Sequence, residues 1–128
     1  MKDKILIVDD SLTNTILLAN VLEKEGYKTE SALGVKEARD IMARKIPDLI
    51  LLDLHLPESS GYDFMKKICK NEQLKSIPVI IVSADEHELA SGRPYEMGAV
   101  GCINKPIDLE YLVEVVKKQL KPSHYVSS

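Results

Sequence analysis

Four short apolar segments of this sequence are each followed by polar side chains that can bind a cation or carry charge. These side chains comprise three carboxylates, one hydroxyl and one amine, at Asp9, Asp10, Asp53, Ser83 and Lys105. Each of them alone is common in a turn or at the start of a helix. Their repeated position after an apolar segment indicates that the fold brings them together.

Such a group of side chains has a definite chemistry. Three carboxylates within a few ångströms would raise one another's pKa unless a cation were present. We therefore expect a hard divalent cation, and Mg²⁺ fits best, with Mn²⁺ as a substitute, because it takes oxygen ligands and bridges carboxylates to phosphate. The amine and the hydroxyl can bind phosphoryl oxygens. The set predicts phosphoryl transfer in which an Asp carboxylate is the nucleophile.

The apolar segments have the length and the branched residues of β-strands. They cover residues 5–8, 49–52, 79–82 and, more weakly, 99–103, and another short strand is expected over residues 28–32. Because the segments are continuously apolar rather than alternating, they are typical of parallel strands buried on both faces. Polar residues that follow parallel strands lie at the same edge of the sheet, where ligands bind in such folds.

Amphipathic segments between the strands predict the covering helices. Ser11 is the expected N-cap of the first helix, and Gly26 ends it. Its expected apolar face consists of Leu12, Ile16, Ala19 and Leu22. Further helices are expected over residues 35–42 and 61–69 and, after the N-cap Asp108, along the stripe Leu109, Leu112, Val113, Val116 and Leu120. Repeated strand–helix–strand units give a doubly wound α/β fold with helices on both faces.

The segment before the last strand contains a helix breaker. Residues 91–94 read Ser-Gly-Arg-Pro, and a proline inside a helix costs about 3 kcal/mol. The sequence therefore predicts a fourth helix that is short and begins near Pro94, or one that is displaced and mobile. Uniformly slow amide exchange across residues 86–97 would contradict this.

Composition excludes several classes of protein. The chain has 128 residues, 45% of them apolar, and a net charge of −3 without a run of Lys or Arg. This argues against binding to nucleic acid or a membrane surface through bulk electrostatics. With no apolar stretch near the roughly 18 residues of a membrane span and no signal peptide, we expect a cytoplasmic domain over residues 1–121 and a short flexible tail over 122–128.

The cysteines and histidines offer no metal site or disulfide. Cys69 and Cys102 form neither a CxxC pair nor a paired framework. We expect each of them to be a small buried apolar residue. The histidines at positions 55, 87 and 124 lack the spacing of zinc ligands.

Taken together, these motifs resemble the receiver domain of response regulators in two-component signalling, the chemotaxis-Y-like family. The resemblance covers about residues 4–120. It rests on Ile-Leu-Ile-Val-Asp9-Asp10, Leu-Ile-Leu-Leu-Asp53-Leu-His-Leu-Pro57 with Gly61, Val-Ile-Ile-Val-Ser83-Ala84 and Gly-Cys-Ile-Asn-Lys105-Pro106. It implies a flavodoxin-like fold with a five-stranded parallel sheet in the order 2-1-3-4-5.

The resemblance also implies a function. Asp53 would accept a phosphoryl group from a histidine kinase or a histidine phosphotransfer protein, and the domain would then switch its contacts with a downstream protein, as a monomer or weak dimer. It would be a signalling phosphoacceptor and not an enzyme, apart from self-catalysed transfer and autodephosphorylation. Neither nucleic acid nor a membrane is an expected direct partner.

Further roles carry over by position. Mg²⁺ would be bound by the carboxylates of Asp10 and Asp53, by the backbone carbonyl of His55 and, through water, by Asp9. Ser83 and Lys105 would bind the phosphoryl oxygens, and the Lys105-Pro106 peptide would be cis. The side chains of His55 and Asp85 would tune the rate of dephosphorylation.

One position departs from the family pattern. Where the family usually has an aromatic residue that swings inward on phosphorylation, this chain has Cys102, and a thiol cannot make that motion. We interpret Cys102 as packed at the sheet edge rather than as a reactive thiol. Tyr111 and Val115 form either an exposed patch for a partner or isolated surface residues, and residues 13–15 lie where donors generally dock.

Two alternatives remain open. One is a binding module that keeps the fold but works without phosphorylation. The other is a phosphatase of the haloacid dehalogenase type, which also uses an Asp nucleophile and Mg²⁺ but needs a second Asp where this chain has His55.

Overall fold

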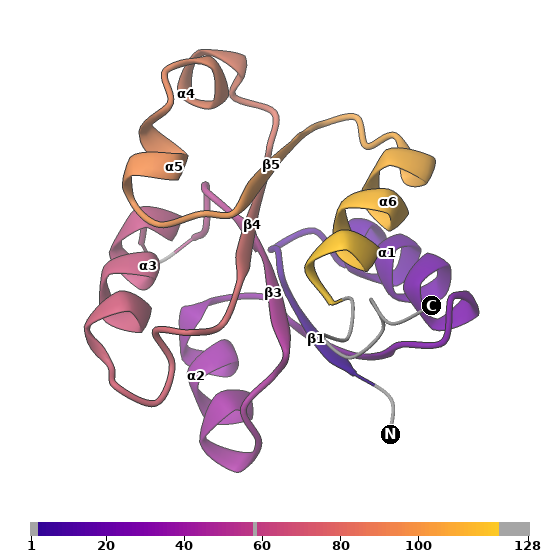
Figure 1. The fold of residues 1–128 in the computed structure, drawn as a ribbon, viewed down its shortest axis with the longest axis horizontal. Coiled ribbons are helices and arrows are strands. Elements are labelled where there is room, and N and C mark those ends of the chain that lie inside the picture. The colour runs from indigo at the N-terminus through magenta and orange to yellow at the C-terminus, as the bar shows by residue number, and fades with distance from the viewer. Residues whose placement is uncertain (1–2, 58, 121–128) are drawn as a thin grey trace, which may run out of the picture.

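The computed structural model describes residues 3–57 and 59–120. Within these residues, five strands alternate with helices (Figure 1). The strands are β1 (Lys4–Val8), β2 (Lys28–Ala32), β3 (Leu49–Asp53), β4 (Val79–Ser83) and β5 (Gly101–Asn104). The helices are α1 (Leu12–Lys24), α2 (Val35–Arg44), α3 (Gly61–Lys70), α4 (Glu86–Ala90), α5 (Arg93–Glu96) and α6 (Leu109–Gln119). The expected tail, residues 122–128, lies outside the described residues.

All five strands are parallel and have the order β2-β1-β3-β4-β5, which confirms the predicted fold. The α1 and α6 helices cover one face of the sheet, and α2, α3 and α5 cover the other (Figure 1). The chain places β2 beside β1 at one edge of the sheet and then adds β4 and β5 beside β3 towards the other edge. The carboxyl ends of β1 and β3 therefore meet where the winding reverses, the usual ligand position in open α/β sheets.

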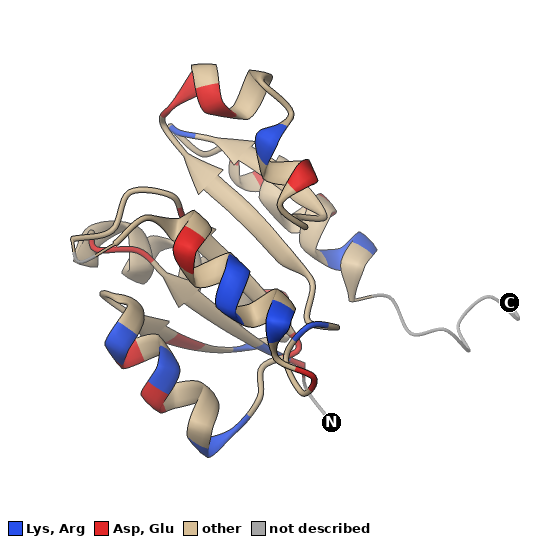
Figure 2. Cartoon of the chain, turned by 90° about the vertical axis from the view of Figure 1, so that its left-hand side faces the viewer, with Lys and Arg blue, Asp and Glu red and all other residues tan. Residues whose placement is uncertain are grey.

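The continuous apolar segments are explained by burial on both faces. Every residue of β3 and β4 is buried. Alternate strand residues belong to different cores: Leu6, Ile50 and Ile81 pack with α2 and α3, whereas their neighbours in sequence pack with α1 and α6. Charged residues of both signs lie along α2 and α3 (Figure 2).

The predicted apolar face of α1 is confirmed at Leu22, which is buried, and at Ala19, which packs against the core, but it is wrong at Leu12 and Ile16. Leu12 and Ile16 are 61% and 53% exposed, and the buried positions are Thr15, Leu18 and Leu22. Burial of Thr15 is tolerated because its hydroxyl donates a hydrogen bond to the Leu12 carbonyl (2.8 Å). The polar residue thus takes a core position and turns the leucine and isoleucine outward.

The helix break is present, with one addition. α4 ends at Ala90, Gly92 has φ +80°, and a separate helix, α5, begins at Arg93. Pro94 lies at the start of α5, where its missing N–H removes no helical hydrogen bond. The helix beginning near Pro94 is therefore confirmed, whereas the short α4 before it was not predicted.

Other expectations fare differently. The α6 stripe is confirmed at Leu109, Leu112, Val116 and Leu120, which pack in one core, but not at Val113. Cys102 is half-buried against the core, but Cys69 is exposed rather than buried. Tyr111 is exposed, as a surface patch for a partner requires. Val115, however, is half-buried against the core that α1 and α6 form with the sheet. Among the residues described, no helix has the length and hydrophobicity needed to cross a membrane.

Candidate functional site

The three predicted carboxylates meet at the carboxyl edge of the sheet. Asp9 and Asp10 follow β1, and Asp53 ends the adjacent strand β3. Oxygens from all three lie within 4.8 Å of one another. Asp9 and Asp53 are 2% and 6% exposed, whereas Asp10 is open to solvent. Two buried acids and one accessible acid thus face the same space.

Lys105 reaches this cluster from the loop after β5. Its Nζ lies 3.0 Å from Asp9 Oδ2 and 3.0 Å from Asp53 Oδ2. The Lys105 N–H donates to the Ser83 carbonyl (2.9 Å), and the Lys105-Pro106 peptide is cis. Burial by itself would lower the pKa of Lys105, but the hydrogen bonds to Asp53 and Asp9 outweigh it and raise that pKa. The ammonium therefore stays charged.

Backbone and amide donors hold the buried carboxylates in place. The Ser11 N–H donates to Asp9 Oδ1 (2.9 Å), and Asn14 Nδ2 lies 3.5 Å from Asp9 Oδ2. The His55 N–H donates to Asp53 Oδ1 (3.1 Å). These bonds orient the oxygens before any cation arrives.

The donor set fits a hard divalent cation. Three carboxylates against one ammonium leave a formal charge of −2, and the ligand atoms on offer are all oxygens. Mg²⁺ takes such ligands and retains water at its remaining positions, which the exposed Asp10 allows. Zinc, by contrast, prefers nitrogen and sulfur ligands.

Ser83 ends β4 beside this cluster and is fully buried. Its Oγ accepts a hydrogen bond from the Asp85 N–H (3.1 Å). A hydroxyl that accepts in this way keeps its own proton for a second partner. The adjacent Ala84 is exposed and small, so the approach to the cluster stays open.

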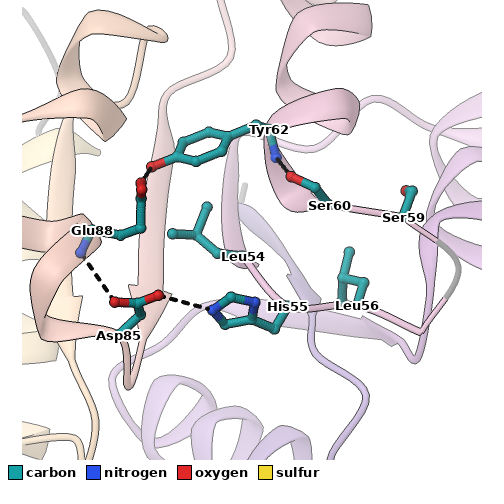
Figure 3. Close-up of a pocket in the computed structure, with 8 residues that line it drawn as sticks. All are labelled: Leu54, His55, Leu56, Ser59, Ser60, Tyr62, Asp85 and Glu88. Carbon is teal, nitrogen blue, oxygen red and sulfur yellow. Dashed lines mark hydrogen bonds and ion pairs between the residues drawn. The ribbon is translucent and has the colours of Figure 1, made fainter.

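His55 and Asp85 face one another from the loops that follow β3 and β4 (Figure 3). His55 Nε2 lies 3.4 Å from Asp85 Oδ2. Asp85 Oδ1 caps α4 by accepting from the Glu88 N–H (3.1 Å), and this bond, followed by the His55 partner, lowers the pKa of Asp85. The imidazole is thus paired with Asp85 in the loop before α4.

Sequence reasoning missed one neighbour of the site, Tyr62. Its hydroxyl donates to the Glu88 carboxylate, and the pair lines a pocket of about 440 Å³ together with His55 and Asp85 (Figure 3). The available signal was an aromatic residue directly after Gly61, at a helix start expected to border the acceptor.

Gly61 itself is required by close packing. A Cβ at this position would lie 2.6 Å from the Asp53 carbonyl oxygen and 2.9 Å from Leu54 Cα. We expect Gly61→Ala to lower the free energy of unfolding by about 2 kcal/mol, because these are backbone atoms that cannot move aside cheaply. Urea denaturation measures this. Gly101→Ala, whose Cβ meets nothing nearer than 3.4 Å, is the control, and equal stability of both variants would contradict the packing argument.

Comparison with known proteins gives the family. The family model described as the response regulator receiver domain matches residues 5–117. The chain belongs to the response regulator receiver family. It is 38% identical to sporulation initiation phosphotransferase F of Bacillus subtilis, over 94% of this chain and 95% of that protein. It is 35% identical to the polar-differentiation response regulator DivK of Brucella ovis, over 94% and 98% of the two chains.

Solved structures agree with this receiver fold. The chemotaxis response regulator CheY4 of Vibrio cholerae superposes with a TM-score of 0.86 and 26% identity, over 94% of this chain and all of that chain. The receiver family acts in two-component signalling as the phosphoacceptor of histidine kinases or phosphotransfer proteins. The match to the receiver family therefore contradicts the alternative that the chain is a phosphatase of the haloacid dehalogenase type.

Proposed function

We propose that this receiver domain accepts a phosphoryl group on Asp53, with Mg²⁺, and then changes its contacts with a downstream protein. The observation that carries the proposal is the position of Lys105, whose Nζ lies 3.0 Å from both Asp9 and Asp53 within the acidic cluster. An ammonium held beside a nucleophilic carboxylate can bind the oxygens of the arriving phosphoryl group.

The transfer follows from these positions. A carboxylate oxygen of Asp53 attacks phosphorus while the P–N bond to the donor imidazole breaks, and the bonding electron pair stays on that nitrogen. Lys105 and the Ser83 hydroxyl bind the phosphoryl oxygens as their charge develops. Mg²⁺, held by the Asp10 and Asp53 carboxylates, the His55 carbonyl and, through water, Asp9, would neutralise charge on the transferred group.

The side chains of His55 and Asp85 are proposed to set the lifetime of the phosphoryl group. They are paired at 3.4 Å in the loops that follow β3 and β4, two residues after Asp53 and Ser83, and would control how water approaches Asp53. Beyond this transfer and its hydrolysis we propose no catalytic activity for the domain.

The surface for the phosphodonor is proposed to lie on α1. Leu12, Ile16 and Leu17 are 61%, 53% and 42% exposed, on the helix whose first residues follow Asp9 and Asp10. Exposed apolar side chains beside an acceptor fit a donor protein that must bring its histidine to Asp53. Thr13 and Asn14 lie on the same first turns and are accessible, so they would contribute to the choice of kinase, whereas Thr15 is buried in the core.

Phosphoramidate, which carries a P–N bond like phosphohistidine, tests the proposal. After incubation with Mg²⁺, intact-mass spectrometry should show one added phosphoryl group, and no adduct should form when the metal is chelated. The absence of an adduct with Mg²⁺ would favour the phosphorylation-independent binding module. Ile16→Ser should label normally with phosphoramidate and more slowly from a phosphorylated kinase.

A further inference from the structure

A cluster of three side chains ties α3 to the α4–α5 segment. The Tyr62 hydroxyl of α3 donates to the Glu88 carboxylate of α4. The Arg93 guanidinium of α5 lies 4.7 Å above the Tyr62 ring, and its NH1 lies 3.8 Å from Glu88 Oε1. Burial and the bond to Glu88 raise the pKa of the Tyr62 hydroxyl, so it remains a donor.

Hydrogen bonds connect this cluster to the phosphorylation site. The Ser83 Oγ accepts from the Asp85 N–H, and the Asp85 Oδ1 accepts from the Glu88 N–H, each at 3.1 Å. Glu88 in turn binds Tyr62 (Figure 3). A change at Ser83 therefore reaches the first turn of α4 through two bonds.

Of the two helices that Tyr62 and Glu88 connect, α3 is firmly positioned at its start and α4 is weakly held. The start of α3 is fixed beside the acceptor because the Gly61 N–H donates to the Leu54 carbonyl (2.7 Å) and its Cα packs on the Asp53 backbone. By contrast, none of the five residues of α4 is fully buried. Its one apolar side chain packed against the core is the partly buried Leu89, so polar bonds such as Tyr62 to Glu88 contribute to the position of α4 beside it.

On β5, Cys102 occupies the position where the family usually has the aromatic residue that moves on phosphorylation. Its side chain is half-buried against the core, and burial raises the pKa of its thiol. A thiol has no ring to move, whereas Tyr62 of α3 brings an aromatic side chain into contact with Glu88 of α4.

We infer that Tyr62, Glu88 and Arg93 form a latch that holds α4 against α3 until Ser83 turns towards a phosphoryl group on Asp53. When the Ser83 side chain rotates to bring its hydroxyl to the phosphoryl oxygens, its Oγ moves away from the Asp85 N–H and the bond between them breaks. The first turn of α4 then shifts and Glu88 leaves Tyr62. This inference rests on the proposed function and names α3 and α4 as the elements that report phosphorylation.

The test removes one oxygen atom from the latch. Tyr62→Phe keeps the ring beneath Arg93 but loses the bond to Glu88, and Tyr95→Phe, on the exposed Tyr95 of α5, is the matched control. Beryllofluoride with Mg²⁺ serves as the phosphoryl mimic. Because coupling is reciprocal, a latch that opposes the phosphorylated state also opposes the mimic. Tyr62→Phe should therefore bind beryllofluoride about tenfold more tightly, and Tyr95→Phe should match the wild type.

Amide hydrogen exchange provides a second measurement. Without the mimic, residues 86–97 should exchange faster in Tyr62→Phe than in the wild type, at rates that the wild type reaches only with beryllofluoride. Glu88→Gln, which keeps an acceptor oxygen but loses the charge, should lie between the two. Unchanged or weaker affinity of Tyr62→Phe, or equal exchange without the mimic, would overturn the latch. Failure of all the proteins to bind beryllofluoride, the wild type included, would instead contradict the proposed function.

Discussion

Replacing Lys105 with methionine should slow phosphorylation of the domain by about 10²–10³-fold, the usual loss when a preorganised donor to a developing anion is removed. Lys105 Nζ lies 3.0 Å from a carboxylate oxygen of Asp53, the proposed phosphoacceptor. The rate of adduct formation from phosphoramidate, followed by intact-mass spectrometry, measures the loss. Lys105→Arg keeps the charge and should lose less. A methionine variant that is phosphorylated at the wild-type rate would contradict this role.

Lys105→Met should also lower the free energy of unfolding of the domain. Asp9 and Asp53 would lose the partner that offsets their charges. The side chains of Lys105, Asp9 and Asp53 are only 19%, 4% and 8% exposed. Breaking a buried ion pair from one side costs about 3 kcal/mol, which urea denaturation can detect. Added Mg²⁺ should recover part of the loss in the variant, because a ligand that binds only the folded state stabilises it.

The pH dependence of this difference has a definite sign. The pKa of Lys105 is raised above its ordinary value of 10.5. A raised pKa means that the stabilisation is fully present below 10.5 and is lost as the pH rises past the raised value. The stability gap between the wild type and Lys105→Met should therefore stay constant through neutral pH and shrink in strong alkali. A gap that closes between pH 6 and 8 would contradict the assignment.

Asp10→Asn should have the second large effect, a fall in Mg²⁺ affinity of at least about 100-fold, since even outer partners of metal ligands are worth 10–100-fold. Asp10 is exposed and its oxygen lies within 4.8 Å of the Asp9 and Asp53 oxygens. Stability without metal should not fall, because the substitution removes a repulsive charge. Calorimetric titration with Mg²⁺ measures the affinity.

The control for Asp10→Asn is Asp40→Asn, on an exposed carboxylate of α2. It changes the net charge equally and should leave Mg²⁺ binding unchanged. Equal weakening by both substitutions would indicate general electrostatics rather than a ligand at Asp10.

The strands and the gathering of polar groups were predictable because both follow from local pattern. The continuous apolar run of residues 49–52 requires burial on both faces, and that places Asp53 at a ligand-binding edge. The face of α1 was not predictable from apolar positions alone, since Thr15 satisfies its hydroxyl on its own helix and takes a core position. A polar residue in the core carries no periodic signal.

The contacts around α4 could not be predicted for a different reason. Tyr62 and Glu88 are 26 residues apart, and their meeting depends on how the broken helix at residues 91–94 places its two short pieces. Similarly, the pairing of His55 with Asp85 depends on how the loop after β3 lies relative to the loop after β4. The sequence indicated that His55 and Asp85 border the site, but their pairing, like that of Tyr62 with Glu88, emerged only from the packing of separate elements.

The site of phosphorylation is the central claim, and it can be measured directly. After reaction with phosphoramidate and Mg²⁺, borohydride reduces an aspartyl phosphate to homoserine, which peptide mass spectrometry can locate. We predict homoserine at position 53 alone, and none in Asp53→Asn. Conversion at another aspartate, or an adduct that persists in Asp53→Asn, would contradict the account.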